Sequence, residues 1–202
     1  MQIMCMIHIN HVQIIVASVR ARRIGPEIAE WVAAVGRDTT SATHEIVDLR
    51  DYPLPMDDEP DIPAAGKPYT QAHTRRWSEK VAAGDAFVFV TPQYNWGYPA
   101  SLKNALDHLY AEWRGKPAMI VTYGGHGGGK CADQLRQVLD GLKMRPVATM
   151  PGLKLRREHI EANTGVIKPA AEFAEYRDAL RQAFVELDAA LARACSAQVD
   201  QT

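Results

Sequence analysis

The chain has 202 residues, of which 47% are hydrophobic and 23% are charged, and its formal net charge is −1. This size and balance are typical of one α/β domain with enough apolar residues for a core, so we expect a single domain over residues 1–202. A nucleic-acid-binding protein needs a clustered basic surface, which 23 basic against 24 acidic side chains do not indicate.

Three cysteines, Cys5, Cys131 and Cys195, are odd in number and widely spaced, so they predict neither a disulfide framework nor a zinc site. The N-terminal stretch is apolar but lacks the basic region and the cleavage site of a signal peptide. No apolar run approaches the roughly 20 residues that span a bilayer. We therefore expect a cytoplasmic protein with no membrane or nucleic-acid partner.

A short apolar strand is predicted over residues 12–17. Residues 1–11 either lengthen this strand or form a frayed N-terminal extension, and the sequence leaves both open. His8 and His11 lie in this part of the chain, and their odd spacing places them on opposite faces of a strand. We therefore predict no metal site there.

Residues 18–26 predict a turn that leads from this strand into a helix. The helix is indicated by an apolar face and a terminal glycine: Ile24, Ile28, Val32, Val35 and Gly36. The turn carries one hydroxyl and three guanidinium groups, on Ser18, Arg20, Arg22 and Arg23. Cations are unfavourable at a helix N-terminus, whereas its free N–H groups bind anions. Arginine adds a fork that matches phosphate oxygens, so the turn predicts a phosphate site, with a solvated basic turn as the alternative.

A second strand is predicted over residues 44–49, followed by a proline-rich, acidic segment over residues 50–68. Asp57, Asp58 and Glu59 lie in this segment, but consecutive carboxylates seldom converge on one metal ion. We therefore expect a solvated loop. A helix is predicted over residues 69–83.

The third strand and the stretch after it are the most informative part of the chain. Residues 87–90 form a continuous apolar run, which indicates a strand buried on both faces. A loop of aromatic and amide groups follows at residues 92–97. Pro99 then suits the first turn of a helix whose apolar face repeats at Leu102, Leu106 and Leu109.

A fourth strand is predicted over residues 118–122, and a glycine-rich loop and a further helix follow it. The inward face of that helix consists of Leu135, Val138, Leu139 and Leu142. A fifth strand is predicted over residues 147–150, and residues 151–169 are expected to be irregular. A last helix is predicted over residues 170–194.

The glycine-rich loop contains two misleading patterns. Gly124, Gly129 and Lys130 match a phosphate-binding P-loop, but Cys131 stands where Ser or Thr would bind magnesium, so we do not predict NTP hydrolysis. Half of a dinucleotide fingerprint at residues 127–132 is weak, because a loop with so many glycines produces such matches easily. A steric interpretation is better: glycines let the backbone approach a flat ring closely, where N–H groups donate to its carbonyls.

Strands and helices alternate throughout, which predicts a parallel sheet covered by helices on both faces. Five strands fit the doubly wound, flavodoxin-like order 2-1-3-4-5, whose switch point lies between strands one and three. This order places the turn at Ser18 and Arg20 beside the loop at residues 93–96. Two loops that are distant in sequence are thus expected to meet at one crevice.

Three segments resemble the NAD(P)H-dependent FMN reductase family, which includes FMN, quinone, azo-dye and chromate reductases. They are residues 17–23 (ASVRxxR), residues 92–107 (PQYNWGYPASLKNALD) and residues 123–128 (YGGHGG). The resemblance covers about residues 12–150, and the middle segment is the most specific of the three. It implies a flavodoxin-like fold, non-covalently held FMN and a homodimer or homotetramer.

Position by position, the resemblance also implies which residues contact FMN, in three loops: Ser18, Arg20, Arg23, Ile24, Gly25, Pro92, Gln93, Tyr94, Asn95, Trp96, Tyr123, Gly124 and Gly125. The first five match the phosphate loop, the next five the loop beside the isoalloxazine and ribityl chain, and the last three the loop at the other ring edge.

The expected activity is ping-pong hydride transfer from NAD(P)H through FMN to a small acceptor such as a flavin, quinone, azo dye or chromate. Flavin carries the chemistry, so no side-chain acid or base is required and no catalytic residue is assigned. One alternative is a one-electron carrier of the flavodoxin type, although such carriers tend to be strongly acidic. Another is an interaction protein that kept the fold without the flavin.

Overall fold

The structure is a computed structural model that describes residues 9–199. Cys5 and His8, and with them most of the predicted N-terminal extension, lie outside the described residues, as does the side chain of Cys195. His11 begins the first strand, so the described end of the extension lengthens the strand.

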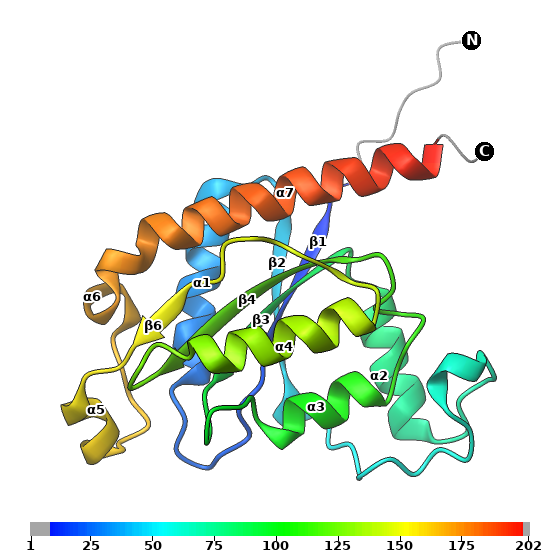
Figure 1. Cartoon of the computed structure of the whole chain (residues 1–202), viewed down its shortest axis with the longest axis horizontal. Helices are drawn as coiled ribbons and strands as arrows, with labels where there is room; N and C mark the ends of the chain where they lie inside the picture. Colours follow the sequence, from blue (N-terminus) through cyan, green and yellow to red (C-terminus); the bar gives the residue numbers. More distant parts are fainter. Residues whose placement is uncertain (1–8, 200–202) are drawn as a thin grey trace.

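A parallel sheet forms the centre of the molecule (Figure 1). Its strands are β1 (His11–Val16), β2 (Thr43–Asp48), β3 (Ala86–Pro92), β4 (Pro117–Gly124), β5 (Arg145–Pro146) and β6 (Gly152–Lys154). The main path runs in the order β2-β1-β3-β4-β5, which confirms the predicted doubly wound topology. In register, Ile14 of β1 lies between Ile46 of β2 and Val88 of β3.

The C-terminal part of the sheet differs from the sequence prediction. The predicted fifth strand over residues 147–150 is wrong: β5 covers only Arg145–Pro146, and the chain leaves the sheet after Val147. Thr149 has its partner outside the sheet, because the Glu186 carboxylate of α7 accepts hydrogen bonds from the Thr149 amide at 2.8 Å and the Thr149 hydroxyl at 2.6 Å. Residues 151–169 are not wholly irregular, since β6 pairs with β4 and a short helix follows it.

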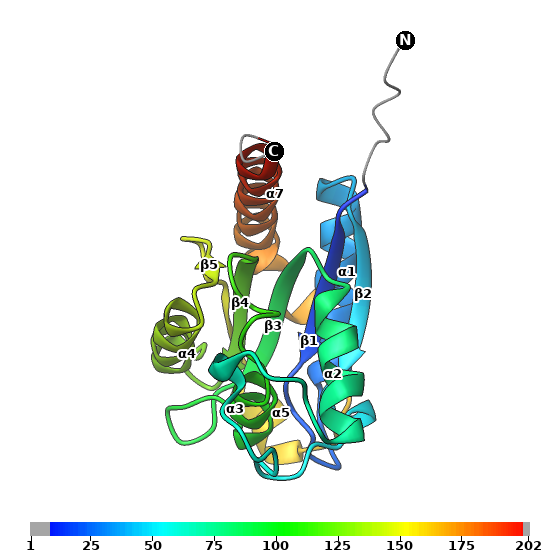
Figure 2. The same cartoon turned by 90° about the vertical axis from the view of Figure 1, so that its right-hand side faces the viewer.

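Helices cover both faces of the sheet (Figure 2). They are α1 (Gly25–Thr39), α2 (Ala72–Ala82), α3 (Ala100–Asp107), α4 (Gly129–Gly141), α5 (Arg157–Ala162), α6 (Pro169–Glu172) and α7 (Arg177–Val199). α1 and α7 pack on one face, and α2, α3 and α4 on the other. The predicted last helix is interrupted between α6 and α7, where Phe173 turns into the core against Trp31. Among the described residues, no helix has the length and apolar character needed to cross a membrane.

Alternating strand residues divide the core into two layers, as expected for strands buried on both faces. Ile14, Val88 and Val121 face α1 and α7. Phe87 and Phe89 face the other helices, where they pack against Trp113. Because both layers are filled, the carboxyl ends of β1, β3 and β4 are held together at one edge of the sheet.

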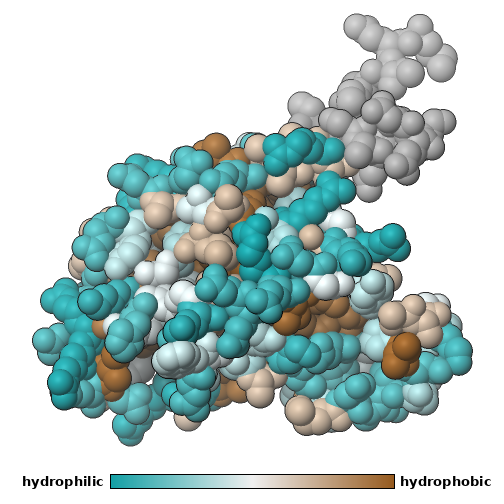
Figure 3. Space-filling view, viewed as in Figure 1, coloured by the Kyte–Doolittle hydropathy of each residue, from teal (hydrophilic) through white to brown (hydrophobic). Residues whose placement is uncertain are grey.

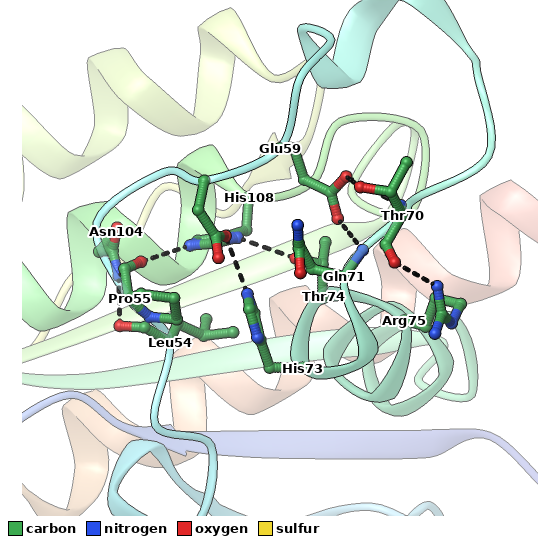
Figure 4. Close-up of polar contacts among 11 residues, drawn as sticks. Leu54, Pro55, Glu59, Thr70, Gln71, His73, Thr74, Arg75, Asn104 and His108 are labelled. Carbon is green, nitrogen blue, oxygen red and sulfur yellow. Dashed lines mark hydrogen bonds and ion pairs between the residues drawn. The ribbon is translucent and has the colours of Figure 1, made fainter.

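The acidic segment after β2 is largely exposed, as predicted for a solvated loop, but it also makes polar contacts with distant residues. Glu59 accepts hydrogen bonds from the Thr70 and Gln71 amides at 2.8 and 2.9 Å, and Asp58 lies 2.9 Å from His73 (Figure 4). The buried His108 contacts the Pro55 carbonyl at 2.9 Å. The loop is therefore fastened to α2 and α3, because these long-range partners satisfy its polar groups.

Candidate functional site

The two loops that were predicted to meet do so. β1 and β3 are adjacent, and Val16 is in register with Val90. Immediately beyond them, the buried Ser18 hydroxyl lies 2.8 Å from the Tyr94 hydroxyl. The site is thus built at the point where the strand order reverses, as the doubly wound topology requires.

A pocket of about 560 Å³ opens at this edge. Three loops at strand ends supply one part of its wall: Ser18, Arg20, Arg22, Arg23, Ile24, Pro92, Gln93, Tyr94, Tyr123, Gly124 and Gly125. The segment after β6 supplies the rest: Leu155, His159, Ile160, Glu161, Asn163, Thr164, Gly165 and Val166. Its volume falls within the range of roughly 300–1,000 Å³ that is usual for small-molecule sites.

The arginines at one end of the pocket have different surroundings. The Arg23 guanidinium donates to both carboxylate oxygens of Asp48 and to the Ser18 carbonyl, and its side chain is only 10% exposed. Arg20 is exposed, and its guanidinium lies 3.6 Å from the centre of the Tyr94 ring. Arg22 is exposed as well. Arg20 and Arg22 can therefore meet a ligand, whereas Arg23 holds the shape of the turn.

The part of the pocket wall formed by the loops after β3 and β4 carries no charged side chain. The backbone N–H of Gln93 donates to the Tyr123 carbonyl at 2.9 Å, which joins the loops after β3 and β4. The Gln93 side chain turns toward α4, where its oxygen accepts from the Cys131 amide at 3.2 Å. Gly124 and Gly125 line the pocket without side chains, so a flat group can approach their backbone closely.

Three of the predicted site residues do not line the pocket. Gly25 is buried, and a side chain there would come within 2.9 Å of the Tyr123 hydroxyl, so this glycine lets Tyr123 pack under the start of α1. Burial raises the Tyr123 pKa far above its ordinary value. Asn95 and Trp96 form the tip of a tight turn with φ of 48° and 73°, and Trp96 is 63% exposed. Lys130 lies 4.2 Å from the Trp96 ring, outside the pocket.

Gly127 and Gly128 of the glycine-rich loop pack against the sheet and do not line the pocket, which corrects part of the steric interpretation. A side chain on Gly127 would come within 2.9 Å of the Gly152 carbonyl, and one on Gly128 within 2.7 Å of Thr122. The Thr122 hydroxyl also donates to the Gly127 carbonyl at 2.7 Å. These glycines therefore allow the loop to approach β4 and β6, and only Gly124 and Gly125 face the pocket.

Cys131, which breaks the P-loop pattern, is a buried packing residue. Its thiol points toward the Pro92 carbonyl at 3.7 Å, and burial raises its pKa to about 12. A thiol with this pKa stays protonated at neutral pH and is a poor nucleophile. Among the described residues, no group of three or more His, Cys, Asp or Glu side chains could hold a metal ion.

Sequence reasoning missed the outer wall of the pocket, residues 155–166. Arg22 belonged to the predicted phosphate turn but not to the FMN contacts that the resemblance implies. The segment is joined to the glycine loop by a hydrogen bond from the Leu155 amide to the Gly124 carbonyl at 2.9 Å. Only a turn signal at residues 163–165 (NTG) marked it in the sequence. Its position follows from the pairing of β6 with β4, which local patterns do not reveal.

Comparisons with known proteins agree with this geometry. The family model described as NADPH-dependent FMN reductase matches residues 11–152, more than half of the chain. An NAD(P)H-dependent FMN reductase of Schizosaccharomyces pombe is 55% identical over 174 residues, which are 86% of this chain and 86% of that protein. An NAD(P)H-dependent FMN reductase of Saccharomyces cerevisiae is 50% identical over 159 residues, covering 69% of this chain and 83% of its own length.

A solved structure resembles the fold at much lower identity. It is a flavoenzyme NAD(P)H:(acceptor) oxidoreductase from Paracoccus denitrificans, with a TM-score of 0.63 and 21% identity over 87% of this chain and 97% of its own. At this identity the likeness supports the fold alone. The family model and the two yeast relatives show that the chain belongs to the NADPH-dependent FMN reductase family of oxidoreductases.

Proposed function

We propose that this chain binds FMN in the pocket and transfers hydride from NAD(P)H through it to a small acceptor in a ping-pong cycle. The observation that carries the proposal is the meeting of three loops at one pocket, with Ser18 and Tyr94 joined at 2.8 Å. One end of this pocket is cationic and the other is lined by glycines and amides. That polarity matches a molecule with a phosphate at one end and a flat ring at the other.

The cationic end fits a phosphate. Arg20 and Arg22 are exposed there, and α1 begins at Gly25 with no side-chain cap from Ile24, so the N–H groups of Gly25 and Glu27 are available to an anion, whereas Pro26 has none. Guanidinium forks and a helix N-terminus both favour phosphate oxygens. In this proposal Arg20, Arg22 and Ser18 hold the phosphate, and Arg23 acts through the carbonyl of Ser18.

The neutral end fits a flat ring system. Pro92, Gln93 and Tyr94 form one side, and the backbone of Gly124 and Gly125 forms the other. When bound, FMN supplies the hydride chemistry. The chain orients the ring by backbone contacts and keeps one edge of the pocket dry with Tyr123 and Pro92, which are both buried. A side-chain acid or base is not needed, so no catalytic residue is assigned.

A binding and turnover experiment tests the proposal. The purified protein should quench FMN fluorescence on titration, and NADPH or NADH oxidation should depend on both FMN and an added quinone. Initial rates at several quinone concentrations should give parallel double-reciprocal lines. A protein that stays colourless and does not quench FMN would instead support an interaction protein without flavin. FMN binding without nicotinamide oxidation would support a flavodoxin-type electron carrier.

The assembly and the acceptor are also part of the proposal. The helix faces of α3 and α4 are proposed to form a homodimer or homotetramer, as the family resemblance implies. Flavins, quinones, azo dyes and chromate are the acceptor classes to compare, and the cytoplasm is the proposed location. Ranking the acceptors by kcat/KM would identify the preferred class.

A further inference from the structure

Residues 155–166 cross the mouth of the pocket from one end to the other. At one end the Leu155 amide donates to the Gly124 carbonyl at 2.9 Å. At the other end Gly165 packs close to the Arg22 backbone, so that a side chain on Gly165 would come within 3.3 Å of the Arg22 Cα. This segment, which contains α5, lies beside the loops at the strand ends (Figure 1). We call it the strap.

The strap is fixed from behind by one carboxylate. Glu172 of α6 accepts a forked pair of hydrogen bonds from Arg156, at 2.8 and 2.7 Å, and its Oε2 lies 3.1 Å from His159. The Glu172 side chain is only 7% exposed. Burial by itself would raise the pKa of this carboxyl, but the hydrogen bonds from Arg156 and His159 outweigh it and lower the pKa. The carboxylate is therefore ionised at neutral pH and anchors the strap.

The surface that the strap presents to the pocket is suited to covering a ligand. Ile160 and Val166 are 50% and 66% exposed although both line the pocket. A ligand that covers these apolar side chains removes them from water, which favours its binding. Asn163 and Thr164 add polar groups near the arginine end of the pocket. On the opposite wall the Arg23 guanidinium is already paired with Asp48. Asn163 and Thr164 therefore supplement the polar groups that remain for a ligand.

We infer that the strap is the outer wall of the FMN site, that it retains the bound flavin, and that Glu172 is the positioning residue that holds it in place. The inference rests on the proposed function. The matched family model ends at residue 152, so the strap lies beyond the residues that the family model matches.

The first test compares two variants that each remove one carboxylate paired with an arginine. Glu172→Gln keeps the shape of the side chain but removes the charge that anchors Arg156 and His159. The control is Asp38→Asn, because Asp38 is 58% exposed and pairs with Arg177 at 2.8 Å, and neither residue belongs to the strap or lines the pocket. FMN titrations of the apoproteins should give a Kd about tenfold higher for Glu172→Gln, the size expected when a charge-assisted anchor is lost, and an unchanged Kd for Asp38→Asn.

A second variant and a second measurement distinguish a role of the strap in retaining FMN from a role in the stability of the protein alone. Ile160→Ser changes an exposed side chain, so the protein should fold normally while FMN dissociates faster. Hydrogen exchange in residues 155–166 should slow when FMN is added to the wild-type protein, which a purely structural strap would not do. Unchanged exchange, or equal FMN affinity in wild type, Glu172→Gln and Ile160→Ser, would overturn the inference. A wild-type protein that binds no FMN would instead overturn the proposed function itself.

Discussion

At the scale of single residues, the arginines after β1 separate into ligand-facing and structural groups. Arg20 is exposed over the Tyr94 ring. Its replacement by alanine should remove one charge-assisted hydrogen bond to phosphate, which contributes about 1.5–3 kcal/mol, and so raise the Kd for FMN by roughly 10- to 150-fold. Fluorescence titration of the apoprotein measures this change. Unchanged FMN affinity in Arg20→Ala would refute the phosphate assignment.

Replacement of Arg23 is expected to lower the stability of the protein, whereas replacement of Arg20 lowers its affinity for FMN. Its pairing with Asp48 is largely shielded from water, with side-chain exposures of 10% and 20%. Arg23→Ala leaves a half-buried carboxylate without its partner, so the free energy of unfolding should fall by about 3 kcal/mol. Urea denaturation without FMN measures the loss, and Arg20→Ala is the control, since removal of an exposed side chain should change stability by no more than about 0.5 kcal/mol. Equal stability of the two variants would show that Arg23 does not hold the turn.

At the scale of elements, the loop after β2 supplies the missing cap of α2. Gln71 at the start of α2 makes no capping bond of its own, and Glu59 accepts from the amides of Thr70 and Gln71 instead (Figure 4). Glu59→Ala should lower the free energy of unfolding by about 1–2 kcal/mol at neutral pH. Asp61→Ala is the matched control, because its pairing with Lys67 is exposed and should contribute less than about 1 kcal/mol.

The same contact predicts a pH dependence. Burial alone would raise the Glu59 pKa, but the hydrogen bonds from Thr70 and Gln71 outweigh it and lower the pKa to about 2. A depressed carboxyl pKa stabilises the fold above the unfolded-state value, and this stabilisation is lost as pH falls toward the folded-state value. The stability difference between wild type and Glu59→Ala should therefore be full above about pH 5 and shrink as pH falls toward about 2. A difference that does not vary with pH would contradict the capping role.

Two adjacent glycines at the start of α4 provide a second test at this scale. Gly128 has φ of 88°, and a side chain there would come within 2.7 Å of Thr122, whereas nothing lies within 4 Å of a side chain on Gly129. Gly128→Ala should therefore destabilise the protein by about 2 kcal/mol or more. Gly129→Ala should be neutral or stabilising by up to about 1 kcal/mol, since it adds a good helix former. Thermal unfolding of the two variants distinguishes the positions, and similar losses in both would contradict the proposed packing.

At the scale of the whole molecule, the prediction concerns assembly. The face seen in Figure 3 is largely hydrophilic, with a few separate hydrophobic patches. On the layer of α3 and α4, Tyr98, Val138 and Leu142 are only partly buried against the core. We expect light scattering to give twice or four times the mass of one chain, with a decrease on dilution. A single-chain mass at all concentrations would exclude α3 and α4 as a stable interface.

Much of the fold was predictable because its signals are local. The buried run at residues 87–90 and the apolar face beginning at Leu102 indicated β3 and α3 with small errors at their ends. The fifth strand was misplaced because Thr149 has its hydrogen-bond partner outside the sheet, on Glu186, which lies 37 residues further along the chain. Likewise, the anchoring of Glu59 could not be predicted, because its partners Thr70 and Gln71 lie 11 and 12 residues away.

The sequence by itself determined the alternation of strands and helices, and hence the edge at which the Ser18 and Tyr94 loops meet. These follow from periodicity and chain order, which are properties of neighbouring residues. Only the tertiary structure decided that Arg23 pairs with Asp48, that Gly127 and Gly128 pack against β4 and β6, and that residues 155–166 line the outer side of the pocket. Those outcomes depend on side-chain directions and on contacts between distant segments, which no local pattern encodes.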